Sequence, residues 1–105
     1  MGFTTVLREE ELWQGETLGI EVRGRRLVLL NVAGQVRAYD DRCPHQGWPL
    51  SRGALCGQEL TCALHQWRYD ARTGAGINPH GVALRAYAVQ VVGGDIMVDL
   101  DGDGD

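Results

Sequence analysis

The feature that most constrains this 105-residue chain is a pair of short Cys/His motifs near its middle. The first motif reads Cys-Pro-His over residues 43–45, and the second reads Cys-Ala-Leu-His over residues 62–65. Sixteen residues (46–61) separate them. Each motif supplies one soft thiolate and one imidazole, so two short loops can bring four ligands to one metal centre. Because two matched pairs seldom arise by accident, the sequence predicts a metal site.

Alternating hydrophobic residues on both sides of the motif region predict an all-β chain. The expected strands cover residues 18–23, 27–32, 36–39, 87–91 and 96–100. Turns at Ala33-Gly34 and Gly93-Gly94 join four of these segments into two hairpins. Strands at this spacing indicate a small antiparallel barrel or sandwich. A single helical turn is expected within residues 8–13.

The length indicates one domain, residues 1–105, with a metal-binding subdomain at about residues 41–81, where alternation is weak. The chain has no Lys and a net charge of −4, which disfavours nucleic-acid binding. Its longest apolar run, residues 27–30, is far short of the ~18 residues that a membrane span needs. Three cysteines, an odd number, and no visible export signal lead us to expect a cytoplasmic protein.

Two metal chemistries compete for the motif pair. A zinc site of the usual Cys₂His₂ kind pairs Cys with Cys and His with His, whereas each motif here carries one of each. An iron–sulfur centre with mixed Cys and His ligation fits that arrangement better. A zinc-binding structural or interaction module stays open as the alternative from a different functional class.

At these residues the chain resembles the Rieske-type [2Fe–2S] ferredoxins of bacterial multicomponent oxygenases. The stretch 43–46, the sixteen-residue gap, Trp67 and the run 74–79 (Gly-Ala-Gly-Ile-Asn-Pro) are most similar to the toluene 4-monooxygenase branch. The resemblance implies a Rieske fold, a strand base with a cluster-binding loop subdomain, and one [2Fe–2S] cluster. It implies that the chain has no catalytic residues of its own and that it binds two protein partners transiently. The partners would be an NADH-dependent flavin/iron–sulfur reductase and a diiron aromatic hydrocarbon monooxygenase; a ring-hydroxylating dioxygenase is the alternative acceptor.

The resemblance also implies roles for individual residues. Cys43 and Cys62 would ligate one iron, and His45 and His65 would ligate the other. The residues expected to surround or cover the cluster are Gln46, Trp67, Tyr69 and Pro79, and those expected to contact partners are Gly47 and Trp48. Trp67 stands where high-potential relatives place a hydroxyl, and the positions of their extra disulfide hold Trp48 and Leu64. A low reduction potential within the Rieske range follows.

Three further features receive less specific interpretations. Cys56 has no partner at a useful spacing and is expected to be an inert thiol. Asp40, Asp41 and Glu59 could form part of an acidic docking rim, although scattered surface carboxylates are more common. The Asp/Gly-rich run 99–105 resembles the start of a calcium loop but lacks its later Glu, so a solvated acidic tail is expected.

Overall fold

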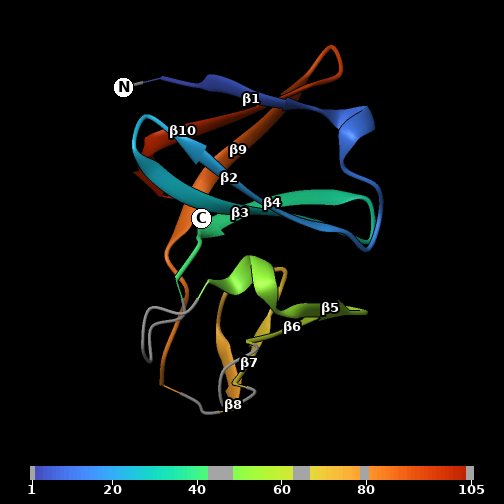
Figure 1. Ribbon diagram of the computed structural model, residues 1–105, viewed down its shortest axis with the longest axis vertical. Helices are drawn as coiled ribbons and strands as arrows, with labels where there is room; N and C mark the ends of the chain where they lie inside the picture. The colour runs from blue at the N-terminus through green and yellow to red at the C-terminus, as the bar shows by residue number, and fades with distance from the viewer. Residues whose placement is uncertain (1, 43–48, 63–66, 79–80, 104–105) are drawn as a thin grey trace.

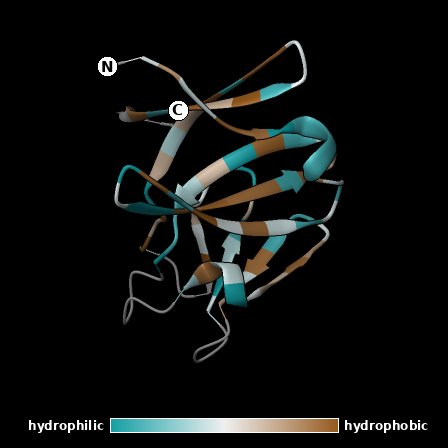
Figure 2. Ribbon diagram, turned by 45° about the horizontal axis from the view of Figure 1, so that its top comes forward, coloured by the Kyte–Doolittle hydropathy of each residue, from teal (hydrophilic) through white to brown (hydrophobic). Residues whose placement is uncertain are grey.

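The computed structural model describes residues 2–42, 49–62, 67–78 and 81–103, and within them the chain is almost entirely strand (Figure 1). The elements in chain order are β1 (Thr4–Arg8), η1 (Glu9–Glu11, a 3₁₀ helix), β2 (Thr17–Val22), β3 (Arg25–Val32), β4 (Gln35–Asp40), η2 (Leu50–Arg52, a 3₁₀ helix), β5 (Ala54–Cys56), β6 (Glu59–Thr61), β7 (Arg68–Asp70), β8 (Gly76–Asn78), β9 (Ala86–Val92) and β10 (Asp95–Asp103). The predicted all-β class is confirmed. The helical turn expected at residues 8–13 is η1, which is hydrophilic along its length (Figure 2).

The strands form two antiparallel sheets, one above the other in Figure 1. The large sheet has the order β1-β10-β9-β4-β3-β2, and the small sheet has the order β5-β6-β7-β8. Strands β4 and β9 are neighbours in the large sheet, and the small sheet lies in the chain between them. The chain therefore leaves the large sheet after Asp40, forms the small sheet, and re-enters the large sheet at Ala86.

Tight turns explain why the predicted hairpins form. Ala33 and Gly34, between β3 and β4, have positive φ angles of 53° and 86°. Arg23 and Gly24, between β2 and β3, repeat that conformation with 53° and 80°. Two consecutive left-handed residues twist as the flanking strands do, which makes this the favoured two-residue hairpin turn. Both predicted hairpins, β3–β4 and β9–β10, are confirmed.

Strand β3 is buried on both faces, which accounts for its uninterrupted apolar run. Leu27 and Leu29 belong to a large-sheet core, made of Leu12, Leu27, Leu29, Val36, Ala38, Tyr87, Ile96, Val98 and Leu100. Val28, Leu30 and Val32 belong to a shared core between the sheets, made of Val28, Leu30, Val32, Tyr39, Leu50, Leu60, Cys62, Tyr69, Ala71 and Leu84. The small sheet is thus built against side chains that the large sheet provides.

The structure adds to the expectations in three places. The small sheet has no counterpart among the expected strands, because its three-residue strands β5–β8 are too short to show a period of two. Strand β1 has no counterpart either, since its sequence Thr-Thr-Val-Leu-Arg does not alternate. The end of β9 is exposed, with Val91 at 40% and Val92 at 49%, and it lies beyond residues 86 and 87, where β4 pairs with β9.

The expectation of a solvated tail over residues 99–105 is partly wrong. Strand β10 continues to Asp103, which pairs with Tyr87 across a bulge. Leu100 packs in the large-sheet core, which explains why the acidic run stays in the sheet. Residues 104–105 lie outside the described residues. No helix in the described ranges has the length and hydrophobicity that a membrane crossing requires.

Candidate metal centre

The structure describes the predicted metal site through the residues at its margins. Of the four predicted ligands, Cys62 is described, whereas Cys43, His45 and His65 lie outside the described residues. The same holds for four of the residues expected to cover the site or contact partners: Gln46, Gly47, Trp48 and Pro79. We call residues 43–48 the first Cys/His segment and residues 63–66 the second.

The second Cys/His segment is closed by a backbone hydrogen bond between the residues that precede and follow it. Strands β6 and β7 pair antiparallel, with Thr61 opposite Arg68. One step further, the Cys62 N–H donates to the Trp67 carbonyl oxygen at 2.7 Å. Both ends of the segment are therefore fixed by the small sheet, and Cys62 is completely buried there.

The first Cys/His segment is closed by a buried carboxylate. Asp41, two residues before Cys43, accepts hydrogen bonds from the Ser51 backbone N–H at 2.7 Å and from the Ser51 hydroxyl at 2.8 Å. Ser51 belongs to η2, so this Asp41–Ser51 bridge joins the chain before the segment to the first element after it. Asp41 is 2% exposed, and such a buried carboxylate is costly unless hydrogen-bonded.

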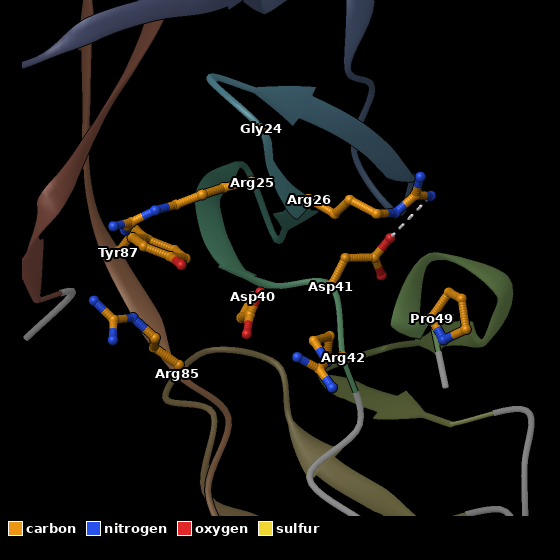
Figure 3. Close-up of a pocket in the computed structure, with 9 residues that line it drawn as sticks. All are labelled: Gly24, Arg25, Arg26, Asp40, Asp41, Arg42, Pro49, Arg85 and Tyr87. Atoms are coloured by element: carbon orange, nitrogen blue, oxygen red, sulfur yellow. Dashed lines mark ion pairs between the residues drawn. The ribbon is translucent and has the colours of Figure 1, made fainter. Parts of the chain in front are cut away.

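The large sheet supports this bridge from two strands. The Arg26 guanidinium of β3 lies 3.9 Å from the Asp41 carboxylate (Figure 3). Gly19 of β2 packs against the bridge so closely that a Cβ there would lie 2.7 Å from the Ser51 hydroxyl oxygen. Only a residue without a side chain fits between β2 and η2.

These contacts correct the expectation of an acidic rim that includes Asp41. Its carboxylate is buried and engaged by Ser51 and Arg26, so it presents no negative charge to a partner. Glu59 pairs with Arg68 at 3.2 Å. The sequence offered no signal for the Asp41–Ser51 bridge, since the two residues are ten positions apart and neither belongs to a motif.

Described residues near both segments belong to the shared core. Leu50, which follows the first segment, and Cys62, which precedes the second, are both completely buried there. Tyr69 is buried in the same cluster, and Trp67 packs against that cluster. A third closure, from the Gly76 N–H to the Val82 carbonyl oxygen at 2.8 Å, spans the stretch that contains Pro79.

A hydrogen bond from Tyr39 joins the large sheet to the chain that follows β7. The Tyr39 hydroxyl of β4 donates to the Ala71 carbonyl oxygen at 2.7 Å, which ties the two sheets together.

Asp70, the last residue of β7, has a lowered pKa. Burial alone would raise the pKa of this carboxyl group. Hydrogen bonds from the Arg72 side chain and backbone, the charge of Arg72, and a hydrogen bond from the Thr73 backbone outweigh burial, so the pKa lies below its usual 3.8.

Comparison with known families decides which metal chemistry the site serves. Residues 2–88 match the model of the Rieske [2Fe-2S] domain, a range that includes all four predicted ligands. This chain belongs to that family. A Rieske domain carries one [2Fe–2S] cluster, so the predicted cofactor is confirmed and the zinc alternative loses its support. The buried Cys62 thiol and the two closed segments fit such a cluster.

Two curated relatives are ferredoxin components of oxygenase systems. One belongs to the naphthalene 1,2-dioxygenase system of Pseudomonas aeruginosa and is 37% identical over 91 residues, covering 86% of this chain and 88% of the relative. The other belongs to the alkene monooxygenase system of Xanthobacter autotrophicus (strain ATCC BAA-1158 / Py2) and is 33% identical over 100 residues, covering 94% and 82%. The chain is therefore an electron-transfer ferredoxin of an oxygenase system and not itself a catalytic enzyme.

A solved structure confirms the Rieske fold. The chain superposes on a chain of the complex of reduced oxygenase and oxidized ferredoxin in carbazole 1,9a-dioxygenase with a TM-score of 0.84. The two are 26% identical, and the match covers 98% of this chain and 94% of that chain. The likeness extends over both sheets, so the small sheet that the sequence pattern did not reveal is part of the family fold.

Proposed function

We propose that this Rieske ferredoxin carries single electrons to the terminal oxygenase of an aromatic ring-hydroxylating dioxygenase system, with an NADH-dependent reductase as the donor. The observation that carries the proposal is the 37% identity to the naphthalene 1,2-dioxygenase ferredoxin over nearly the whole of both chains. The solved neighbour, from a complex of ferredoxin with an oxygenase, supports the same kind of acceptor. The cytoplasmic location expected from the cysteines remains a prediction.

We further propose that Cys43 and Cys62 hold one iron and that His45 and His65 hold the other. The bound cluster would accept one electron and release it to the acceptor. Support comes from the burial of Cys62 and from the two hydrogen-bonded closures, which join the residues that flank each segment. On this account residues 1–105 are one domain, and the small sheet is its cluster-binding part.

The described residues around Cys62 would keep water away from the cluster. Leu50, Leu60 and Tyr69 are completely buried in the shared core, and Trp67 packs against them. The reduction potential of such a centre depends on how much solvent reaches it and on how many hydrogen bonds its sulfurs accept. Gln46 and Pro79 are proposed to complete the cover, and Gly47 and Trp48 to form the edge that contacts partners.

A diiron monooxygenase is the second candidate acceptor. The alkene monooxygenase ferredoxin, at 33% identity, favours it, and so does the Trp67 position that resembles the toluene 4-monooxygenase branch. The dioxygenase assignment takes precedence because the naphthalene system ferredoxin is the more similar of the two relatives and the solved complex also comes from a dioxygenase.

Reconstitution separates the two acceptors. The assay combines the cluster-loaded ferredoxin and an NADH-dependent ferredoxin reductase with one of two acceptors. The acceptors are the naphthalene 1,2-dioxygenase oxygenase and the toluene 4-monooxygenase hydroxylase. The amount of product is compared with the amount of NADH consumed. We expect coupled turnover with the dioxygenase. Turnover with the diiron hydroxylase alone would establish the second candidate, and no transfer to either would refute the proposed function.

The proposed contact residue Trp48 can be tested in the same assay. Trp48→Ala should retain the visible spectrum of the cluster and slow electron transfer to the oxygenase.

A further inference from the structure

A groove of about 570 Å³ opens between the large sheet and η2, and arginines dominate its walls (Figure 3). Arg25 and Arg26 come from β3, Arg42 follows β4, and Arg85 precedes β9. Asp40 and Asp41 are the groove's two carboxylates. Residues that are far apart in the sequence thus place four of the chain's ten arginines in one depression.

The groove is positive although the chain as a whole is negative. Four arginines face two carboxylates in a chain whose net charge is −4. One of the carboxylates, Asp41, is buried and bound to Ser51 and Arg26. Asp40 alone remains to balance the other cations, and Arg42 and Arg85 lie on either side of it in Figure 3.

Three of the four arginines form no ion pair with a carboxylate among the described residues, and one of them, Arg25, donates instead to the Leu100 carbonyl oxygen at 2.8 Å. Arg42 makes no ion pair within the described ranges and is exposed. The Arg85 guanidinium lies 5.1 Å from the centre of the Tyr87 ring, a cation–π contact that orients the group and leaves its N–H donors available. Exposed cations of this kind attract the carboxylates of a partner.

The position of the groove links it to electron transfer. Arg42 and Pro49 both line it, and they are the residues immediately before and after the first Cys/His segment. That segment carries two of the proposed ligands, Cys43 and His45, and the proposed contact residue Trp48. A protein that contacts the groove is therefore brought to the base of the segment where the cluster is held.

We propose that this arginine groove binds an acidic segment of the terminal oxygenase and orients the ferredoxin for electron transfer. The inference rests on the proposed function, because it takes the oxygenase as the acceptor. An acidic partner would be repelled by the chain's overall charge and attracted only at the groove, which favours one docking orientation. The contribution is electrostatic, so it weakens as salt screens the charges.

The test is the second-order rate constant for oxidation of the reduced, loaded ferredoxin by the oxygenase that the wild type serves, measured by stopped flow. Arg42→Gln/Arg85→Gln should lower this rate constant about tenfold at low ionic strength and approach the wild type at high salt. Arg8→Gln/Arg37→Gln removes the same charge outside the groove and should stay within about twofold of the wild type. Arg42→Lys/Arg85→Lys retains the charge and should recover most of the rate.

Several results would overturn the inference. The first is an equal rate constant in the groove variant (Arg42→Gln/Arg85→Gln) and the control variant. The second is a groove variant whose rate depends on salt as the wild type's does. The third is a Lys variant that is as slow as the Gln variant. A larger loss with the reductase than with the oxygenase would assign the groove to the donor and also contradict the proposal. If the wild type transfers no electrons to any oxygenase, the proposed function itself fails. An unaffected groove variant of an active ferredoxin refutes the groove alone.

Discussion

The two sheets of this ferredoxin are stabilised in different ways. The large sheet has strands of five to nine residues, tight turns between neighbours, and a core of its own. The small sheet has strands of three residues, and its buried side chains pack in a core that β3 and β4 share. Hydrogen bonds from Ser51 to Asp41, from Cys62 to Trp67 and from Gly76 to Val82 close the chain segments beside it.

The difference indicates that the large sheet is specified by local pattern and the small sheet by tertiary contacts. Short strands bury too little surface to be stable alone, so a sheet of this kind depends on packing from outside. In a metal-binding region the bound metal adds folding free energy. We therefore expect the small sheet to depend on the cluster and the large sheet to be largely independent of it.

The largest effect is expected from removing a ligand. Cys62→Ser should abolish the cluster, whereas Cys56→Ser should retain it, because Cys62 is completely buried in the shared core and Cys56 is exposed. The two variants make the same chemical change at Cys56, the last residue of β5, and at Cys62, the residue after β6. Visible absorption of the purified proteins measures the outcome, and loss of the cluster in Cys56→Ser would show that the ligands are misassigned.

Removal of the cluster from the wild type should open one sheet and spare the other. In the iron-free protein, amide hydrogen exchange should accelerate strongly at Leu60 and Tyr69 in the small sheet. Leu29 and Val98, in the large-sheet core, should remain protected. A uniform loss of protection would contradict the distinction between the sheets, as would no loss anywhere.

An intermediate effect is expected from the Asp41–Ser51 bridge. Asp41→Ala removes two hydrogen bonds to a buried carboxylate and should lower the free energy of unfolding by about 1.5–3 kcal/mol. The matched control is Asp95→Ala, which removes a surface pair with Arg8 and should cost at most about 1 kcal/mol. Urea denaturation measures both, and equal losses would show that the bridge is an ordinary surface contact.

The smallest effect is expected from Asp70 and depends on pH. Because the folded-state pKa lies below 3.8, the ionised carboxylate stabilises the fold at neutral pH, and that contribution is lost as the pH falls through the folded-state pKa. Asp70→Asn should be less stable than the wild type by at most about 1 kcal/mol at neutral pH, since Arg72 is exposed. The difference in urea midpoints should shrink in acid, and a difference that grows there would contradict this sign.

The sequence predicted five of the six strands of the large sheet, all but β1, because those five carry visible signals. Leu27–Val32 and Ile96–Leu100 are long enough to show a pattern, and Ala33-Gly34 marks a turn. The four expected ligands came from motif spacing, and the family match supports the cofactor that they imply. The Asp41–Ser51 bridge and the arginine groove arise from residues brought together by the fold, so no local pattern could predict them.

The most direct test of the account is the metal and sulfide content of the anaerobically purified protein. A Rieske cluster held by Cys43, His45, Cys62 and His65 requires about two iron and two acid-labile sulfide per chain. We expect those values, a red-brown colour, and no stoichiometric zinc. One zinc per chain without sulfide would contradict the account and restore the zinc-binding module as the better interpretation.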